Sequence, residues 1–337
     1  MPIKLIVKPE QLTSGRAYNS LIVDNAALEA KRVFKNICST NTGKTKSTGL
    51  STLGFKSKKK GTRHSFRLCR FPKLATPAKT ALGDVYFTES IPKEAMGKEY
   101  TISFEKGRWF ANVQQHINIR TEKQGRVKCV AIDPGVRAFA TCYSESEVVV
   151  AGENIAKERL YPLMLQADKI ISQRQLIYNQ FPKVPFADLP QWARDRLTHL
   201  QHRFYKVKCK KDDIVRDYHH RLAFELVSNY DVIFLPTFET KGMVRRCKGR
   251  TIRRNTCRQM LDLCHYKFKL LLKWYAKKYG KHMVDCCEAY TTKTLSWSGK
   301  VLNNVGGSKT VSDNTYTVDR DINAARGILI KALNKAA

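Results

Sequence analysis

The sequence contains few acidic residues for its size and, despite ten cysteines, no two cysteines separated by two residues. It therefore lacks the CxxC spacing that is usual in a tetrahedral zinc site. It also lacks a signal peptide and any apolar run long enough to cross a membrane. We expect a reduced intracellular protein in which most cysteines are small buried apolar residues.

The charge balance is strongly basic, with 61 Lys and Arg residues against 29 Asp and Glu residues and a formal net charge of +32. This excess is larger than solubility requires and indicates a polyanionic partner such as a nucleic acid. Charge alone would also suit a structural RNA-binding or chromatin protein. With 337 residues, 42% of them hydrophobic, the chain has room for two domains and a sizeable core.

The first candidate catalytic residue is Asp133, which follows a short apolar run. The run, residues 127–132, has the composition of a strand buried on both faces, and the turn signal Pro134-Gly135 follows it. Residues 137–143 then read as a second strand. A carboxylate at the end of a core strand is costly to bury unless it is paired or binds a metal. An Asp that simply caps the turn is the alternative.

Two further carboxylates, Asp319 and Asp321, directly precede a predicted amphipathic helix near the C-terminus. Carboxylates at a helix N-terminus favour the helix dipole and can be plain caps. An Asp at a strand end early in the chain and an Asp at a helix start late in the chain are also typical of RNase H-like nucleases. In those enzymes, acidic side chains from distant segments converge on two divalent cations.

Five motifs follow one another along the chain: AIDPGVRAFATC, DVIFLPTFETKGM, RQMLDLCHYKF, CEAYTTKTLSWSGK and DRDINAARGIL. In order and spacing, over about residues 60–337, they resemble the TnpB/Fanzor family of transposon-associated, RNA-guided, RuvC-like DNA nucleases. The match is closer to the Fanzors and their nearest TnpB relatives than to the family at large. The resemblance implies an endonuclease that uses a guide RNA and two Mg²⁺ ions to hydrolyse double-stranded DNA, with no membrane and no required protein oligomer. A decayed or domesticated relative that binds nucleic acid without cleaving it is the alternative.

The same resemblance predicts an α/β fold, an RNase H-like (RuvC) mixed sheet with helical insertions, preceded by a small β-rich, barrel-like wedge domain. Residues 1–60 are expected to be a remnant of a helical recognition region. Residues 61–122 would form the wedge-like nucleic-acid-binding domain, and residues 123–337 the nuclease domain. The family's longer N-terminal region is expected to be shortened here, as in a truncated copy or a compact variant.

Periodicity predicts the individual elements. We expect strands at residues 65–71, 84–88, 148–150, 231–235 and 283–289, and a hairpin at residues 100–113. We expect helices at residues 25–37, 153–181 with a break at Pro162, 191–230 and 254–279, the last ended by Gly280.

The resemblance implies three carboxylates that are both catalytic and metal-binding. Asp133 is the first, and Asp321 is the last because it directly precedes the sequence INAA. Typical relatives carry a Glu where this chain has Pro236, which cannot bind a metal. Glu288 ends another predicted core strand and matches the relocated Glu of Fanzors, so it is preferred as the third ligand over Glu239.

Relatives carry a zinc ribbon between the last two carboxylates, and residues 290–318 are the corresponding segment. The four positions of the zinc-binding cysteines hold Leu295, Ser298, Val311 and Asn314, none of which is a normal zinc ligand. We therefore expect a degenerate ribbon without zinc.

Basic side chains are expected to contact backbone phosphates in three places: near residue 60, on the long helix and in the loop after residue 243. A solvated basic face is the alternative. The candidates are Lys58, Lys59, Lys60, Arg63, Arg196, Arg203, Lys206, Arg245, Arg246, Arg250, Arg253 and Arg254. The basic run at residues 56–60, with the Fanzor-like motifs, favours the nucleus of a eukaryotic or eukaryotic-virus host; the cytoplasm of a bacterium is the alternative.

Overall fold

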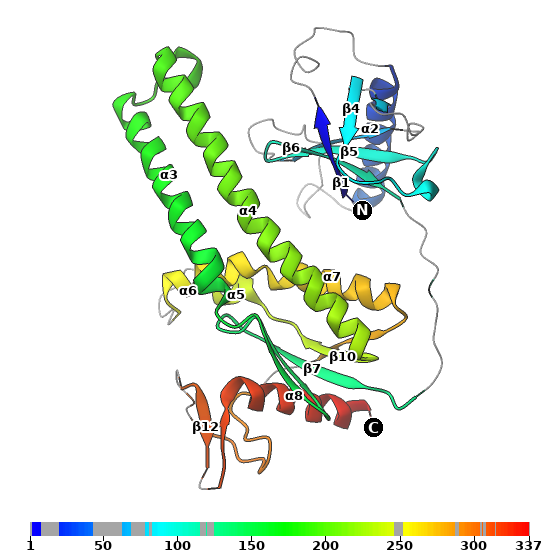
Figure 1. Ribbon diagram of the computed structural model, residues 1–337, viewed down its shortest axis with the longest axis vertical. Helices are drawn as coiled ribbons and strands as arrows, with labels where there is room; N and C mark the ends of the chain where they lie inside the picture. The colour runs from blue at the N-terminus through cyan, green and yellow to red at the C-terminus, as the bar shows by residue number, and fades with distance from the viewer. Residues whose placement is uncertain are drawn as a thin grey trace. The chain divides into compact units, whose positions relative to one another are not determined.

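The computed structural model divides the chain into two compact units, Met1–Ile117 and Asn118–Ala337 (Figure 1). It describes residues 2–7, 20–42, 63–68, 78–80, 83–114, 119, 125–245, 252–286, 290–303, 305, 308–313 and 315–336. Among the helices within these ranges, none is both long and apolar enough to cross a membrane.

The first unit is built on a six-stranded antiparallel sheet in the order β2-β5-β6-β1-β4-β3. The strands are β1 (Pro2–Val7), β2 (Arg63–Leu68), β3 (Ala78–Thr80), β4 (Gly83–Phe87), β5 (Tyr100–Glu105) and β6 (Arg108–Val113). The predicted hairpin is confirmed as β5 and β6, whose two-residue turn has positive φ at Lys106 and Gly107. Positive φ at both turn residues matches the right-handed twist of the strands. Ile102 of β5 and Ala111 of β6 are opposite each other in the hairpin and are completely buried.

The N-terminal segment differs from the expectation of a separate helical remnant. Strand β1 pairs with both β4 and β6, so it lies inside the sheet of the first unit. The helix α2 (Ser20–Asn41) is longer than the predicted residues 25–37. The barrel-like form is not seen either: within the described strands, no pairing joins the end strands β2 and β3.

The second unit contains a five-stranded mixed sheet in the order β11-β10-β7-β8-β9. Strand β10 runs parallel to both β7 and β11, whereas β8 runs antiparallel to β7 and β9. The strands are β7 (Cys129–Pro134), β8 (Ala140–Ser144), β9 (Val148–Ala151), β10 (Val232–Pro236) and β11 (His282–Cys286). The expected α/β unit with a mixed sheet is therefore present.

Helices cover both faces of this sheet, which explains why its central strands are apolar throughout. On one face, Val130 and Ile132 pack against α4 (Gln191–Asn229) and α7 (His265–Lys278). On the other face, Ala131 packs against Ile328 of α8 (Arg320–Ala336). Figure 1 shows α8 and the α4/α7 pair on opposite sides of the strands.

Two predicted helices, residues 153–181 and 254–279, are each divided in the structure. The first of them consists of a π-helical turn, Ala156–Leu160, followed by α3 (Tyr161–Gln180). Pro162 lies in the first turn of α3, where a proline is tolerated. Helix α3 forms a hairpin with α4, which has its own apolar core around Ile170 and Leu200. The predicted helix 254–279 is interrupted at Cys264, whose φ of 52° separates α6 (Arg254–Leu263) from α7.

The strand that carries Asp133 also begins and ends later than predicted. It occupies Cys129–Pro134, and the next strand starts only at Ala140 because the intervening residues form a turn. In this turn the Gly135 amide donates a 3.1 Å hydrogen bond to the Phe139 carbonyl. A Cβ at Gly135 would lie 2.7 Å from the backbone oxygen of Ala138, so the turn requires glycine there.

Candidate active site

Asp133 lies at the end of β7, half-buried and opposite Thr141 of β8. Side chains alternate between the two faces of a strand, so Asp133 shares the face of Ala131. That face is covered by α8, because Ala131 packs with Ile328 and Leu329. The predicted position of Asp133, at the end of a core strand, is confirmed.

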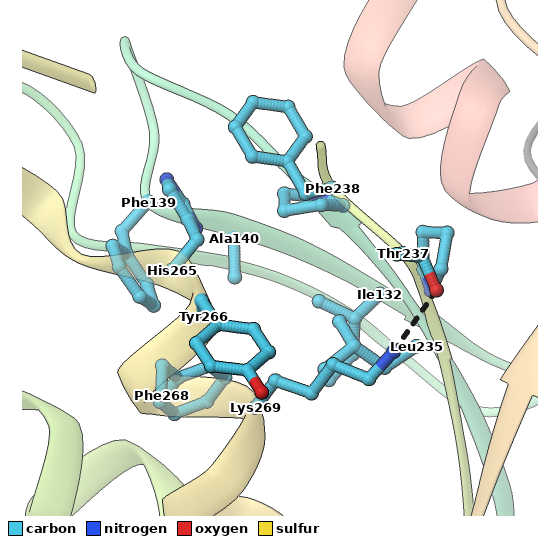
Figure 2. A pocket seen from close by; sticks show the side chains of 12 residues that line it. Ile132, Phe139, Ala140, Leu235, Thr237, Phe238, His265, Tyr266, Phe268 and Lys269 are labelled. Carbon is cyan, nitrogen blue, oxygen red and sulfur yellow. Dashed lines mark hydrogen bonds between the residues drawn. The ribbon is translucent and has the colours of Figure 1, made fainter. Parts of the chain in front are cut away.

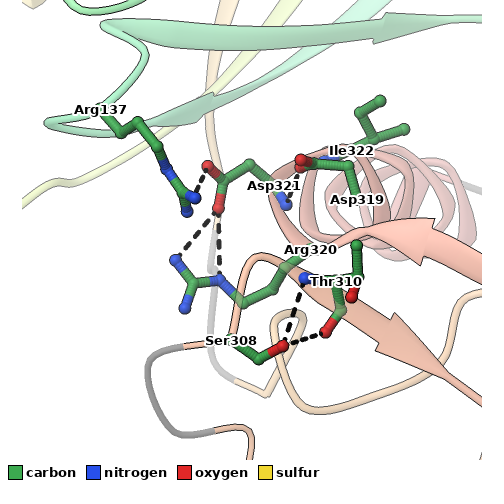
Figure 3. Close-up of polar contacts among 7 residues, drawn as sticks. All are labelled: Arg137, Ser308, Thr310, Asp319, Arg320, Asp321 and Ile322. Carbon is green, nitrogen blue, oxygen red and sulfur yellow. Dashed lines mark hydrogen bonds and ion pairs between the residues drawn. The ribbon is translucent and has the colours of Figure 1, made fainter.

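Asp321 lies in the first turn of α8, the helix that covers the same face. Its backbone amide donates a 2.8 Å hydrogen bond to Asp319 Oδ1, and the Ile322 amide donates to the same oxygen at 3.4 Å. Asp319 is thus the N-cap of the helix, which agrees with the capping role considered for it. Asp321 is left with its carboxylate directed toward the turn after β7, as Figure 3 shows.

Two arginines contact the Asp321 carboxylate. Arg137 Nη2 lies 3.5 Å from Asp321 Oδ2, and Arg320 Nη2 lies 3.3 Å from Asp321 Oδ1 (Figure 3). The three side chains are between 22% and 37% exposed, so water partly screens these ion pairs. Arg137 was not among the predicted site residues, although its place four residues after Asp133, in the turn that follows β7, was a signal that it lies at the site.

A polar cavity of about 440 Å³ opens beside this carboxylate. Its walls include the cations Arg137, Lys157 and Arg320, the carboxylate of Asp321, and the amide side chain of Gln259. Three cations against one carboxylate make the cavity electropositive, which suits a phosphate group. Nucleic-acid backbone is therefore a chemically suitable occupant.

Pro236, the position at which the resemblance implies a Glu in typical relatives, lies at this edge of the sheet. In the β10–β7 register Phe234 is opposite Ala131, so two residues further along Pro236 lies beside Asp133. Pro236 is buried, and Cys286 of β11 is its partner on the other side. Glu239 is exposed and immediately precedes the short helix α5 (Thr240–Met243).

Glu288, the preferred third ligand, lies outside the described residues. Within those residues there is no group of three His, Cys, Asp or Glu side chains suited to a metal ion. The structure thus places two of the three expected carboxylates, Asp133 and Asp321, on one face at one edge of the sheet. Carboxylate oxygens are the donors that Mg²⁺ prefers, and the Asp321 carboxylate is also paired with Arg137 and Arg320.

A small apolar cavity of about 30 Å³ lies at the same edge but on the opposite face of the sheet (Figure 2). His265 is stacked on Phe139 at 4.5 Å between ring centroids, and burial lowers the pKa of His265 to about 4. Burial likewise lowers the pKa of His219, whose Nε2 lies 3.0 Å from the Leu263 carbonyl oxygen, to about 4. Lys269 donates a 3.0 Å hydrogen bond to Thr237 at the cavity's rim. Both histidines are buried parts of the core.

The segment expected to be a degenerate zinc ribbon has an apolar centre. Leu295 is fully buried and Val311 is 3% exposed, whereas Ser298 is exposed and Asn314 lies outside the described residues. Val311 belongs to β12 (Thr310–Ser312), which pairs antiparallel with β13 (Thr317–Asp319). Trp297 Nε1 donates a 2.6 Å hydrogen bond to Asp313.

Asn323 anchors this segment to α8, a role that the sequence analysis did not assign. Its side chain is 1% exposed, accepts a 2.8 Å hydrogen bond from the Ser296 amide and donates one of 2.9 Å to the Thr294 carbonyl. The segment is thereby connected to the helix turn that carries Asp321.

The predicted nucleic-acid-binding residues fall into two groups. Lys58, Lys59, Lys60, Arg246 and Arg250 lie outside the described residues, and Arg63 begins β2, with nothing described of its side chain. The others are exposed: Arg196, Arg203 and Lys206 lie on α4, Arg245 follows α5, and Arg253 and Arg254 lie at the start of α6.

Comparison with known proteins identifies relatives of one kind. Residues 265–328 match the family described as Cas12f1-like, TNB domain. A protein of Paramecium bursaria Chlorella virus 1 that carries the name of a transposase is 29% identical over 64% of this chain and 46% of its own length. A TnpB-like protein of Acanthamoeba polyphaga mimivirus is 28% identical over 59% of this chain and 36% of its own.

More distant matches agree. InsQ of Escherichia coli, which carries the name of an RNA-guided DNA endonuclease, is 23% identical over 74% of this chain and 60% of its own length. A Cas12f1–sgRNA–target DNA complex matches 83% of this chain and 69% of the solved one at 15% identity, but its TM-score of 0.39 is too low to support an argument. The chain spans about half the length, or less, of the first viral relatives. By its sequence, the chain is a relative of the TnpB family.

Proposed function

We propose that this protein is an RNA-guided DNA endonuclease of the TnpB/Fanzor type, and that residues 118–337 form its RuvC-like, RNase H-like nuclease domain. The observation that carries the proposal is the position of Asp133 and Asp321. They come from segments 188 residues apart, one at a strand end and one at a helix start, and lie on the same face at one edge of a mixed sheet. The relation to TnpB-like proteins supports this interpretation.

Some residues of the site would bind metal, and others would bind the substrate. Asp133 and Asp321 would hold Mg²⁺, and Glu288 is proposed as the third ligand. When bound, the ions would polarise the phosphodiester and lower the pKa of the attacking water. Asp319 fixes the start of α8 by capping it, so that the Asp321 carboxylate keeps its orientation.

The cations beside Asp321 would serve the substrate. Arg137, Lys157 and Arg320 line the cavity at the carboxylate, where a DNA backbone would pass. Sequence specificity would come from pairing between a guide RNA and the target strand, while the protein recognises backbone and duplex shape.

A binding protein that no longer cleaves is the second candidate, and Pro236 favours it. Pro236 is buried beside Asp133 at the strand end where relatives carry a Glu, so this edge has one carboxylate fewer on β10. The two candidates make opposite predictions for hydrolysis and the same prediction for binding.

Cleavage of labelled target DNA by the copurified ribonucleoprotein, with and without Mg²⁺, tests the proposal. Sequencing of the copurified RNA supplies the target sequence. We expect Mg²⁺-dependent cleavage that Asp133→Ala and Asp321→Asn each reduce to a few per cent or less, while a mobility-shift assay shows nearly unchanged DNA binding.

Asp217→Asn is a matched control, because Asp217 is an exposed α4 carboxylate paired with Arg221 at 3.0 Å. It should leave cleavage unchanged. Binding without cleavage in the wild type would support the second candidate, and substantial residual cleavage in either site variant would place the metals elsewhere.

A further inference from the structure

An exposed group of aromatic side chains lies where the C-terminal half of α4 runs along α7. We name it the aromatic patch: Phe224 of α4 with Trp274, Tyr275 and Tyr279 at the end of α7. The Phe224 and Tyr279 rings are 5.9 Å apart, Tyr275 and Tyr279 are nearly parallel at 6.0 Å, and Trp274 and Tyr275 are 5.1 Å apart. Phe224 is 50% exposed, Trp274 47% and Tyr279 36%. Large rings this open to solvent, and in contact with one another, form an interaction surface.

The patch is also basic, which restricts the partner. Lys278 Nζ lies 5.3 Å from the Trp274 ring centroid and 5.4 Å from that of Tyr279, so its charge is placed between two aromatic faces. His220 Nδ1 lies 3.0 Å from the Tyr275 hydroxyl. Helix α7 contains five lysines and no acidic residue.

Two carboxylates near the patch come from α4: Asp217 is paired with Arg221 at 3.0 Å, and Glu225 is exposed next to Phe224. A third, Asp231, is paired with Lys281 at 2.7 Å. The C-terminal half of α7 adds Lys273, Lys277 and Lys278, so the surroundings remain positive overall. Aromatic rings combined with lysines suit a partner with flat π-faces and negative charge, which is the chemistry of an unpaired nucleic-acid strand.

The position of the patch in the fold indicates which nucleic-acid strand binds there. Helix α7 begins at His265, near the sheet edge formed by Ile132 and Pro236. It ends at the other edge, where Lys281 pairs with Asp231 just before β10 begins. The patch therefore lies at the opposite edge of the sheet from Asp133 and Asp321. A DNA strand that is hydrolysed must reach those carboxylates, whereas a nucleic-acid strand bound at the patch is held without being cut.

We propose that the aromatic patch binds unpaired bases of the guide RNA by stacking, with the α7 lysines contacting the adjacent phosphates. This inference rests on the proposed function only for the identity of the RNA. Stacking of a base on an exposed ring contributes about 1–3 kcal/mol on alanine substitution, which corresponds to roughly a 5- to 150-fold change in affinity. Two rings removed together should give a change in the upper part of that range.

The test measures binding of a labelled single-stranded RNA, first oligouridylate and then the copurified RNA, to the full chain by fluorescence anisotropy. The variants are Trp274→Ala/Tyr279→Ala and the conservative Trp274→Phe/Tyr279→Phe. Trp192→Ala is the matched control, since Trp192 is 55% exposed at the other end of α4. We expect the alanine variant to bind RNA at least tenfold more weakly, the phenylalanine variant within threefold of wild type, and the control unchanged.

Several results would overturn the inference. Equal affinities of the alanine variant and the control would show that the rings do not stack with RNA. An equal loss of affinity for single-stranded DNA of the same sequence would remove the assignment to RNA. A change in oligomeric state on size-exclusion chromatography, with RNA binding intact, would assign the patch to a protein partner. Thermal unfolding of each variant checks that the fold is retained. The RNA-binding assay does not depend on cleavage. If the wild-type protein cleaves no DNA but the alanine variant still binds RNA tenfold more weakly, the proposed function is contradicted and this inference stands.

Discussion

The guanidinium of Arg137 lies 3.5 Å from the carboxylate of Asp321, so the turn after β7 contacts the start of α8 through an ion pair. Arg320 approaches the other oxygen of the same carboxylate at 3.3 Å. A divalent cation at Asp321 would have to share this carboxylate with both arginines or displace them. The contact therefore links metal binding to the position of Arg137.

Replacement of Arg137 by Gln should tighten divalent cation binding, because a positive charge that competes for Asp321 is removed. Partly exposed ion pairs contribute up to about 1 kcal/mol, so the Kd for Mn²⁺ should fall about two- to fivefold in isothermal titration calorimetry. Cleavage should nevertheless slow, since a phosphate contact is lost. Arg126→Gln, which breaks an exposed 2.6 Å pair with Glu145, is the control. Weaker Mn²⁺ binding in the Arg137 variant would contradict this account.

The third carboxylate can be assigned by comparing two glutamates. Pro236 cannot bind a metal, and Glu239 is exposed beyond the end of β10. Glu288→Gln should therefore reduce cleavage as strongly as Asp133→Ala, while Glu239→Gln should keep most of the rate. Single-turnover cleavage rates at saturating Mg²⁺ are the measurement. The reverse ranking would return the ligand to the segment that follows β10.

Acid should destabilise the second unit through its two buried histidines. Burial holds the pKa of both His219 and His265 at about 4, below the ordinary 6.5. The unfolded chain binds these protons first, so the free energy of unfolding should fall as the pH is lowered from about 6.5 to about 4. Each histidine contributes at most about 3 kcal/mol to that loss.

Urea unfolding across this pH range measures the effect. His265→Phe should give a shallower dependence on pH, because one of the two groups no longer takes up a proton on unfolding. If the free energy of unfolding of the wild type does not change over this pH range, the two rings take up protons in the folded state as readily as in the unfolded chain.

The segment 290–318 should fold without zinc, since buried Leu295 and Val311 occupy two of the four positions that the resemblance assigns to zinc-binding cysteines. Metal analysis should find less than one tenth of a zinc ion per chain, and a chelator should not change hydrogen exchange in the segment. Leu295→Ala should cost about 3 kcal/mol locally and accelerate that exchange, whereas exposed Ser298→Ala should not. One zinc per chain would contradict the alignment of the four positions.

Local patterns in the sequence determined much of the second unit. The apolar run before Asp133 predicts a strand buried on both faces, and the structure confirms that helices cover both sides of it. The amphipathic pattern after Asp321 likewise predicts the helix that became α8. These features follow from the sequence because a strand's alternation and a helix's 3.6-residue period are properties of neighbouring residues.

Only the tertiary structure decided which distant residues meet. The pairing of β1 with β4 and β6, the position of Pro236 beside Asp133, and the ion pair from Arg137 to Asp321 join segments far apart in the chain. The break at Cys264 is a similar case, since its left-handed backbone turns α7 onto the sheet within a continuous helical pattern. Strand register and helix packing set these contacts, and both depend on how the whole core is filled, which no local pattern of the sequence specifies.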